Sequence, residues 1–435
     1  MQTHFTDAQR EDPRVRIAEP ILRKCVHCGF CTATCPTFVL LGDELDSPRG
    51  RIYLMKEMLE HGRPADAETV KHVDRCLSCL SCMTTCPSGV NYMHLVDEGR
   101  AHIEETFVRA PADRALRALL AAVLPYPARF RLAIRAAALG APFAPLLERA
   151  GETGARLAAM LRLAPRALPK PSAFPQEVVK PAQKPVARVA LLAGCAQKPL
   201  RPSINDAAIR LLTRLGVEVV QPKGEGCCGA LTHHLGRDEE ARAFARRDID
   251  VWTAEIEARG LDAVVVTASG CGTVLKDYGH MLQDDPAYAA KAAKISALTR
   301  DVTEFLASLP LKPLANRQKL TLAYHSACSM QHGQKITSLP KELLRNAGFE
   351  VRDPPEGHLC CGSAGTYNIL QPKLAAALRA RKIANIRSTG ADAIAAGNIG
   401  CMTQIGDGAG APVLHTVELL DYAYGGPAPA ALAAV

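Results

Sequence analysis

The sequence predicts a multidomain α+β fold, with a helical, cysteine-rich domain at the N-terminus followed by two copies of one α/β domain. Three observations lead to this prediction. A four-cysteine motif occurs twice before residue 90, a proline-rich stretch lies near residue 175, and a pattern of strands, helices and cysteines then occurs twice. With 435 residues, the chain is long enough for two to four domains with buried cores.

The N-terminal domain is predicted from the paired motifs CVHCGFCTATCP, at 25–36, and CLSCLSCMTTCP, at 76–87. In each copy, gaps of two, two and three residues separate the cysteines, and a proline follows. This is the bacterial ferredoxin pattern, in which three thiolates of one loop bind a [4Fe–4S] cluster and the fourth cysteine binds the neighbouring cluster. The motifs therefore predict a bis-[4Fe–4S], ferredoxin-like domain over residues 1–105. The predicted ligands are Cys25, Cys28, Cys31 and Cys86 for one cluster, and Cys35, Cys76, Cys79 and Cys82 for the other.

A structural zinc site fits these motifs less well, because zinc is normally bound by two separated pairs of ligands. Between the motifs, Ser47 and Pro48 predict the start of a helix, and residues 93–108 predict another after the second motif. Arg49 and Arg51 also lie between the motifs. One interpretation is that these arginines contact an acidic group or adjust the properties of a cluster. The other is that they belong to a solvated loop.

Residues 106–164 are rich in alanine, leucine and arginine and predict short amphipathic helices broken by prolines. From Arg109 to Lys170 there are eleven basic residues against three acidic ones, a net charge of +8 that equals the formal charge of the whole chain. The segment is either a solvated spacer or a docking surface for a partner or a membrane. In the second case, its exposed arginines would contact the partner or the membrane. Candidates are Arg114, Arg117, Arg129 and Arg131. The proline-rich residues 165–187 predict an extended linker.

Several classes of protein are disfavoured by what the sequence lacks. The polar N-terminus carries no apolar signal segment, and cysteines that bind clusters need a reducing compartment, so we expect a cytoplasmic protein. No run of about 18 apolar residues is evident, so no transmembrane helix is expected. The basic segment carries no nucleic-acid recognition motif, and we expect no nucleic-acid partner.

The second half is a duplication, predicted as one repeat over residues 188–310 and another over 311–435. In each repeat a single cysteine follows an apolar run, a Cys-Cys-Gly (CCG) sequence comes 32 residues later, and a fourth cysteine follows another apolar run. Strands alternate with helices, which predicts parallel α/β units. In the first repeat the expected order is strand 188–193, helix 203–215, strand 217–221, helix 237–259 and strand 263–267. In the second it is strand 320–324, helix 335–347, strand 349–352, helix 371–389 and strand 392–396.

The repeat cysteines fall at the carboxyl ends of predicted strands, where open α/β sheets bind ligands. They are Cys195, Cys227, Cys228 and Cys271 in the first repeat, and Cys328, Cys360, Cys361 and Cys401 in the second. Adjacent cysteines form an awkward disulfide but good cluster ligands. Three interpretations remain open: a further Fe–S cluster in one repeat or shared between them, a redox-active thiol site, or cysteines that only pack.

Histidines near these cysteines could take part in a redox site, although each is more often a packed or surface residue. They are His233, His234, His325 and His332. No nucleotide-binding glycine motif opens a predicted βα unit, so no nicotinamide or flavin site is expected on this chain and no catalytic residue is assigned to it.

The order of domains resembles the iron–sulfur subunits of flavin-linked 2-hydroxy-acid and glycerol-phosphate dehydrogenases. The segment CVHCGFCTATCPTFVLLGDELDSPRGRIYL is especially similar to the glycolate oxidase iron–sulfur subunit family. This resemblance implies an oxidoreductase complex in which FAD-containing partner subunits oxidise glycolate to glyoxylate. The chain would carry the electrons toward a quinone or a similar membrane-linked acceptor, as a cytoplasmic protein or a peripheral one on the inner face of the membrane.

The sequence departs from the fullest CCG pattern, which ends in CxxC, because each repeat here offers four thiolates rather than five. The resemblance therefore leaves open whether a cluster forms there. An alternative function is a self-contained disulfide or quinone reductase that uses the CCG half. A further alternative is the equivalent subunit of a lactate or glycerol-3-phosphate dehydrogenase.

Overall fold

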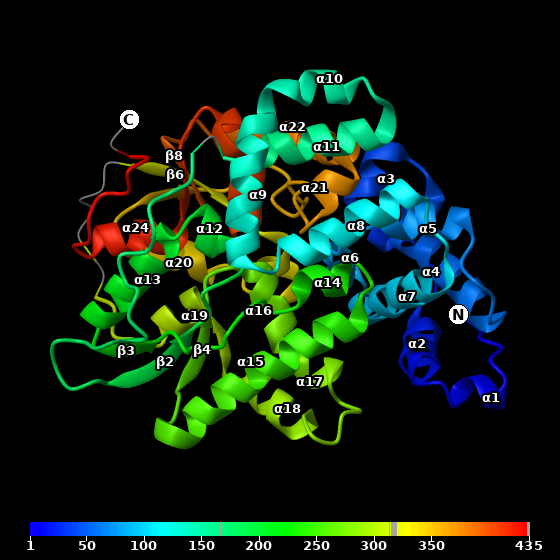
Figure 1. Ribbon diagram of the computed structural model, residues 1–435, viewed down its shortest axis with the longest axis horizontal. Helices are drawn as coiled ribbons and strands as arrows, with labels where there is room; N and C mark the ends of the chain where they lie inside the picture. The colour runs from blue at the N-terminus through cyan, green and yellow to red at the C-terminus, as the bar shows by residue number, and fades with distance from the viewer. Residues whose placement is uncertain (166, 313, 315–319, 433–435) are drawn as a thin grey trace.

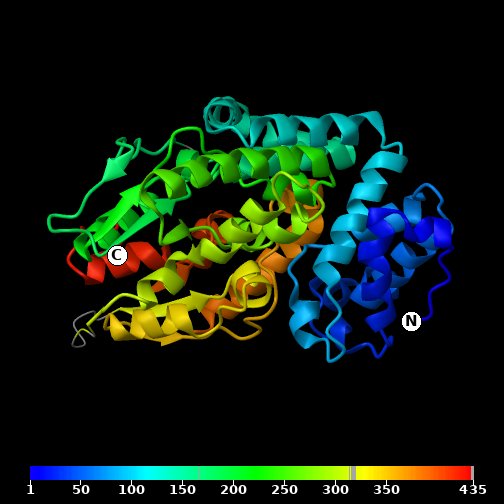
Figure 2. The same cartoon turned by 90° about the horizontal axis from the view of Figure 1, so that it is seen from below.

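The computed structural model describes residues 1–165, 167–312, 314 and 320–432. Residue 166 of the predicted linker, and residues 313, 315–319 and 433–435 of the predicted second repeat, lie outside the described part. The multidomain α+β prediction is confirmed. A helical N-terminal domain lies beside two α/β units, and a helical arm runs from that domain across them (Figures 1 and 2).

The N-terminal domain consists of helices around the two cysteine loops. Helices α2 and α7 pack together with α4, and the core they form includes the buried Leu22, Met55 and Leu95. The predicted helix start is confirmed, since the Ser47 side chain accepts a hydrogen bond from the Gly50 amide at the head of α4. The helical segments are α1 Asp7–Arg10, α2 Pro13–Lys24, η1 Phe30–Thr32, α3 Pro36–Leu41, η2 Glu44–Asp46, α4 Pro48–Glu60, α5 Ala67–Asp74, α6 Ser81–Thr85 and α7 Tyr92–Thr106.

The arm consists of the short helices that the prolines predict: α8 Pro111–Val123, α9 Pro127–Gly140, η3 Ala141–Phe143, α10 Ala144–Glu148 and α11 Gly151–Leu163. Contrary to expectation, the run Pro127–Glu148 is by length and composition apolar enough to cross a membrane, with a mean hydropathy of 1.3 and 11% of its 18-residue window buried. Alanines raise its hydropathy without forming one uninterrupted run of large apolar residues. Arg117 is also not a surface residue, because it is buried and paired with Asp74 at 2.7 Å.

The proline-rich segment is extended, as predicted, but it is bound to the first repeat along part of its length. Strand β1, Val178–Val179, pairs antiparallel with β3 at the edge of the sheet. The backbone amide of Ala173 also donates to the carboxylate of Asp206 at 2.9 Å. The linker prediction therefore needs correction, since two-residue edge pairing leaves no signal in the hydrophobic pattern.

The first repeat has a sheet of order β1-β3-β2-β4-β5, in which every pair except β1–β3 is parallel. The remaining strands are β2 Ala187–Leu191, β3 Val217–Val220, β4 Ala263–Val266 and β5 Thr299–Asp301. The helices are α12 Gln197–Leu200, α13 Ser203–Arg214, α14 Ala230–His234, α15 Asp238–Arg259, α16 Ser269–Lys276, α17 Tyr278–Met281, α18 Ala289–Leu298 and α19 Val302–Ala307.

The second repeat has the matching parallel order β7-β6-β8-β9. Its strands are β6 Thr321–His325, β7 Glu350–Arg352, β8 Ala393–Ala396 and β9 Val413–His415. Its helical segments are the π-helical turn η4 Ser329–Gly333, α20 Leu339–Asn346, α21 Tyr367–Leu370, α22 Pro372–Arg387, α23 Ile399–Ile405, η5 Gly406–Ala409 and α24 Thr416–Ala423. One apolar core runs through both repeats, and α13 packs on α24 across their junction.

The predicted parallel strands and helices of both repeats are confirmed within a few residues at their ends. One helix starts later than expected, at Leu339 rather than at residue 335, because Lys335 has a φ of 60° and interrupts the helical backbone. The sequence pattern missed the fourth parallel strand of each repeat, and the short helices α16 and α23 that carry Cys271 and Cys401.

Candidate metal centres

The cysteines of the N-terminal domain line two neighbouring cavities. One is lined by Cys25, Cys28, Cys31 and Cys86, with Cys82 at its wall. The other is lined by Cys35, Cys76, Cys79 and Cys82. The structure thus brings together both sets of four cysteines that the spacing predicts, and each set includes one cysteine from the opposite motif.

The two cysteine loops share an unusual backbone conformation at matched positions. His27 and Ser78 have φ values of 55° and 48°, and Gly29 and Leu80 have φ values of 84° and 62°. Non-glycine residues rarely adopt this left-handed region, and each costs of order 1 kcal/mol when it does. The same turn is therefore built twice at an energetic cost, as expected for loops that must direct several side chains to one point.

Burial keeps free thiols in these cavities protonated. It raises the pKa of Cys31 to about 11 and the pKa values of Cys79 and Cys82 well above their usual range. A bound metal is the usual means of stabilising buried thiolates, because it replaces the lost hydration. Four convergent sulfur donors in each cavity fit the ligand set of a [4Fe–4S] cluster.

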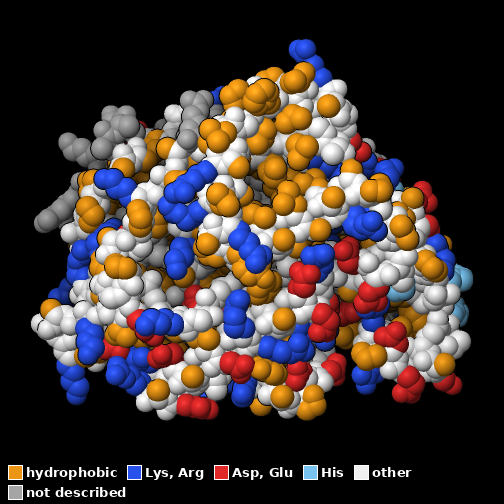
Figure 3. Space-filling view, viewed as in Figure 1, with side chains coloured by type: hydrophobic (Ala, Val, Ile, Leu, Met, Phe, Trp, Pro, Cys, Tyr) orange, Lys and Arg blue, Asp and Glu red, His pale blue; other side chains and the backbone are white. Residues whose placement is uncertain are grey.

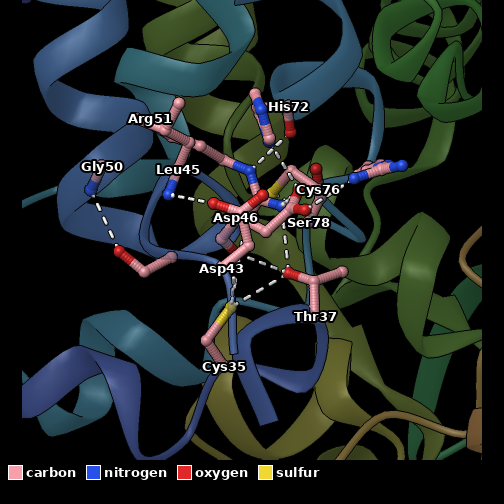
Figure 4. A network of polar contacts seen from close by, with 12 residues as sticks. Cys35, Thr37, Asp43, Leu45, Asp46, Gly50, Arg51, His72, Cys76 and Ser78 are labelled. Carbon is pink, nitrogen blue, oxygen red and sulfur yellow. Dashed lines mark hydrogen bonds and ion pairs between the residues drawn. The ribbon is translucent and has the colours of Figure 1, made fainter. Parts of the chain in front are cut away.

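Arg51 lies against the second of these sets, in a buried polar network (Figure 4). It is 1% exposed, so the solvated-loop interpretation is wrong for this residue. Its guanidinium donates to Asp46 Oδ1 at 3.2 Å and to Cys35 Sγ at 3.8 Å. By contrast, Arg49 remains at the surface, where it pairs with Glu44. Nothing in the sequence predicted this difference between two arginines in one helix turn.

The four cysteines of the second repeat, here called the repeat-2 cysteines, come together at the carboxyl ends of its strands. Cys328 follows β6, Cys360 and Cys361 precede Gly362, and Cys401 lies in the first turn of α23 after β8. The Sγ atoms of Cys328 and Cys360 are 3.7 Å apart. A nitrogen of His325 and the sulfur atoms of Cys361 and Cys401 lie within 4.8 Å of one another.

The four cysteines of the first repeat, here called the repeat-1 cysteines, form the matching group. Hydrogen bonds from Cys195 and Cys228 lower the pKa of Cys227 to about 4, and the thiol of Cys271 interacts with Cys228. The Tyr278 hydroxyl donates to the backbone carbonyl of Cys228 at 2.9 Å. All sixteen cysteines lie in the described part of the chain, and none of them forms a disulfide there.

The N-terminal domain contacts the second repeat through these cysteine groups. Cys79 and Cys360 lie in one buried apolar cluster with Leu77 and Tyr367, and Cys328 packs against it. Next to this cluster, the Thr84 hydroxyl is 2.7 Å from His332 Nδ1. A ligand-bearing loop of the ferredoxin-like domain therefore meets the repeat-2 cysteines directly.

Two of the candidate histidines have structural roles. His332 bridges Thr84 and the His358 carbonyl between the domains. His233 lies between Asp97 Oδ2, at 3.2 Å, and Asp238 Oδ1, at 3.0 Å, and these carboxylates overcome its burial and raise its pKa to about 10. A third histidine, His234, is held neutral because burial lowers its pKa to about 4. A nitrogen of His325 lies within 4.8 Å of the sulfur atoms of Cys361 and Cys401.

Two charged residues near the repeat cysteines were missed by sequence reasoning. Lys382 is 2% exposed and interacts with all four repeat-2 cysteines. Asp248 is fully buried beside Cys227 of the first repeat. Both lie on long helices with ordinary polar spacing, so no sequence signal could have identified them as buried.

Comparisons with known families agree with the two kinds of cysteine group. The family described as "4Fe-4S dicluster domain" matches residues 21–90. The family described as "Cysteine-rich domain", CCG, matches residues 189–276 and 322–406.

Individual relatives share much of the chain. It is 43% identical over 97% of its length to the "Glycolate oxidase iron-sulfur subunit" of Escherichia coli K12, with 99% of that protein covered. It is 32% identical to the "Probable glycolate oxidase iron-sulfur subunit" of Bacillus subtilis, over 90% of this chain and 89% of that protein. "Lactate utilization protein A" of Bacillus licheniformis is 28% identical over 54% of this chain and 99% of its own. A solved structure, that of a hypothetical protein from Helicobacter pylori, shares the fold, with a TM-score of 0.56, 11% identity, and coverage of 99% of this chain and 75% of its own.

Proposed function

Since the chain belongs to the family of glycolate oxidase iron–sulfur subunits, we propose that it receives electrons from a flavin-containing partner subunit that oxidises glycolate to glyoxylate, and delivers them to a quinone or a similar acceptor. The chain is an iron–sulfur electron-transfer component of an oxidoreductase complex. Glycolate, FAD and the acceptor belong to the proposal, as does the assignment of substrate chemistry to the partner.

We assign the [4Fe–4S] ligands by cavity. Cys25, Cys28, Cys31 and Cys86 would hold one cluster, and Cys35, Cys76, Cys79 and Cys82 the other. When bound, such clusters supply one-electron transfer without proton or atom transfer. The protein would bury the clusters, which excludes water. The left-handed turns of the two cysteine loops would hold each loop in one conformation.

One observation carries the proposal: Cys79 and Cys360 lie in a single buried apolar cluster. This cluster joins a ligand-bearing loop of the ferredoxin-like domain to the repeat-2 cysteines. Cys28 is the exposed member of the eight N-terminal cysteines, so the same chain of cysteines reaches the protein surface at its other end. An arrangement of this kind suits electron relay rather than a closed catalytic pocket.

We further propose that at least one repeat holds a redox site. Four thiolates in one place would repel one another as anions, so they require metal, protons or disulfide bonding. The repeat-2 cysteines lie nearer to the ferredoxin-like ligands and are the stronger candidate for an additional Fe–S cluster.

Glycolate is favoured over lactate by the extent of the match. Glycolate oxidase subunits match across 90% or more of this chain, whereas the lactate utilization proteins match across 54% of it. A match over 97% of the chain includes nearly all of the N-terminal domain and the arm.

The experiment uses the full chain, purified anaerobically, alone and with its co-purified flavoprotein partner. Alone, it should show iron–sulfur absorbance that dithionite bleaches and air restores, with no turnover of glycolate. With the partner, glycolate should bleach the same absorbance. Turnover of a disulfide or a quinone by the chain alone would instead support a self-contained reductase.

We also propose that the arm binds the membrane surface, which would make this a peripheral protein of the inner face. Leu132, Leu139, Phe143 and Leu146 are 67, 81, 61 and 68% exposed. These four residues lie along α9, η3 and α10, and apolar side chains gather over this part of the molecule (Figure 3).

Exposed arginines beside this apolar face complement anionic lipid headgroups. They are Arg129, Arg135 and Arg149. Helix α9 also packs on α12, which begins two residues after Cys195, so the same helix connects the surface to the repeat-1 cysteines.

Flotation with vesicles of phosphatidylglycerol and phosphatidylcholine tests the membrane proposal. The triple variant L139E/F143E/L146E should remain unbound, whereas V186E, at a 71% exposed position just before β2, should float like the unmodified chain. If the triple variant floats equally well and also retains the flavoprotein, the arm is only a spacer. If it floats but fails to retain the flavoprotein, the face binds that partner instead.

A further inference from the structure

The two repeats carry the same cysteines in different surroundings. Three residues before the first cysteine, the second repeat has His325 and the first has Leu192. Leu192 is 2% exposed and lies in an apolar cluster with Cys228. His325 is equally buried, but its neighbours are the sulfur atoms of Cys361 and Cys401, within 4.8 Å. The duplication therefore places an imidazole in one site where the other has only a hydrocarbon side chain.

The imidazole of His325 is not satisfied by the protein around it. Its Nε2 atom is buried and has no hydrogen-bond partner among the described residues. Buried polar atoms are nearly always hydrogen-bonded, so an orphaned one needs an explanation. A bond to a metal would be such an explanation for an imidazole that lies next to two thiols, because neutral imidazole is among the commonest metal ligands in proteins.

The number of donors indicates what kind of metal group fits. His325 and the repeat-2 cysteines together offer five donor atoms, and a structural zinc ion binds four. Two thiolates on one tetrahedral metal, each about 2.3 Å from it, lie about 3.8 Å apart. The separation of Cys328 Sγ and Cys360 Sγ is 3.7 Å. Two of the sulfur atoms are therefore spaced correctly to bind one metal atom, and further donors remain for others. This favours a group that contains more than one metal atom.

The charged side chains around the two cysteine groups also differ. Gly362 faces the Ala375 carbonyl and Gly229 faces the Ala241 carbonyl, so helices α22 and α15 are equivalent. Seven residues beyond those alanines come Lys382 in the second repeat and Asp248 in the first. The buried Lys382 Nζ donates to the Glu356 carbonyl at 2.9 Å. Burial lowers the pKa of Lys382, and negative charge on any of the four repeat-2 cysteines opposes that lowering.

A cation beside the repeat-2 cysteines stabilises thiolates and a negatively charged cluster. In the first repeat, the carboxylate of Asp248 accepts from the Gly226 amide at 2.9 Å and pairs with Arg247, which also donates to the Cys227 carbonyl at 3.1 Å. An anion and a cation therefore lie together beside the repeat-1 cysteines. The number of ligands favours the second repeat as the place where an iron–sulfur group is held.

We propose that His325 is a fifth protein ligand of an iron–sulfur cluster held by the repeat-2 cysteines, and that the first repeat lacks an equivalent ligand. This inference rests on the proposed electron-transfer function, because it deepens the assignment of a redox site to one repeat. It supplies, in the second repeat, the fifth donor that a final CxxC pair would otherwise provide.

The test uses the full chain, labelled with [¹⁵N]histidine and reconstituted anaerobically with iron and sulfide. Iron analysis should give more than the eight atoms that two [4Fe–4S] clusters hold. Pulsed EPR of the reduced protein should show ¹⁵N coupling on a signal distinct from those of the ferredoxin-like domain. His325→Leu, which copies the residue of the first repeat, should lose this coupling and at least part of the additional iron.

Two further variants separate ligation from folding. His325→Cys keeps a donor and should retain the additional iron while losing the ¹⁵N coupling. His358→Leu, two residues before Cys360 and partly exposed, should retain both. A chain with eight irons, zinc in the repeat-2 site, or ¹⁵N coupling that survives His325→Leu would each overturn the proposal. Failure of glycolate to reduce a chain that still shows the coupling would instead overturn the proposed function alone.

Discussion

Replacing Arg51 should destabilise the N-terminal domain far more than replacing its neighbour Arg49. Arg51 is 1% exposed, and its guanidinium donates to Thr37 Oγ1 at 3.0 Å, to Asp46 Oδ1 at 3.2 Å and to the His72 carbonyl at 2.6 Å. The Arg51→Met change removes the charge and every donor while preserving much of the side-chain volume.

The magnitude follows from what the variant leaves behind. Removing one member of a buried ion pair costs about 3–5 kcal/mol, because the other charge stays buried. Asp46 keeps Arg75 at 2.7 Å and His72 Nδ1 at 3.0 Å, so the lower end, about 3 kcal/mol, is expected. The side chains of Arg49 and Glu44 are 33 and 47% exposed, and Arg49→Met should cost about 0–1 kcal/mol.

Urea unfolding of the full chain, kept anaerobic and followed by circular dichroism, measures the difference. For a domain of this size the urea dependence is about 1–1.5 kcal/mol per M, so Arg51→Met should lower the midpoint by about 2–3 M. Adding Asp46→Asn should restore part of the loss, because the remaining carboxylate is then neutral. If the midpoints of Arg51→Met and Arg49→Met agree within about 0.5 M, the buried pair does not stabilise the domain as argued.

Three more predictions concern other parts of the chain. Cys28→Ser should reduce bound iron by about four atoms, because one cluster loses a ligand; unchanged iron would contradict the ligand assignment. Gly362→Ala should lower the melting temperature more than Gly425→Ala. The new Cβ at position 362 would lie 2.7 Å from the Ala375 carbonyl oxygen, whereas Gly425 has a φ of +96° but no atom within 4 Å of the added Cβ. Equal losses would show that only φ matters. His233 has a pKa raised to about 10, so its ion pairs should stabilise the fold fully below about pH 6.5 and lose this effect as the pH rises toward 10. His233→Gln should flatten that part of the stability–pH curve, and a slope that persists in the variant would refute the assignment.

Much of the fold was predictable because it depends on local patterns. The alternation of apolar runs with amphipathic stretches predicted the parallel strands of both repeats, and β3 ends within one residue of its predicted limit at 221. Short elements without periodicity were not predictable, and β1 is the clearest case. Its two valines pair with the edge of a sheet formed by residues much later in the chain, which only the tertiary fold brings there.

The candidate sites were predictable only as far as cysteine spacing reaches. Spacing predicted which cysteines of the two motifs would meet, because a loop of fixed length restricts where its thiols can point. It could not predict that Cys79 and Cys360 would share one buried apolar cluster, since nothing in either motif refers to the other domain. Nor could it separate Arg51 from Arg49, because burial is decided by the helices packed around them.

The duplicated half shows most directly how a repeat can preserve a backbone while its chemistry diverges. Both CCG turns use a glycine with a φ above +80°, and both face an alanine carbonyl of the following long helix. Those features fix where four sulfur atoms converge, and they are the same in the two repeats. The charged side chains around those sulfur atoms differ, with the buried Lys382 in one repeat and an ion pair between Asp248 and Arg247 in the other. Selection on these few positions can therefore give one repeat a metal site and the other a different role without disturbing the shared core.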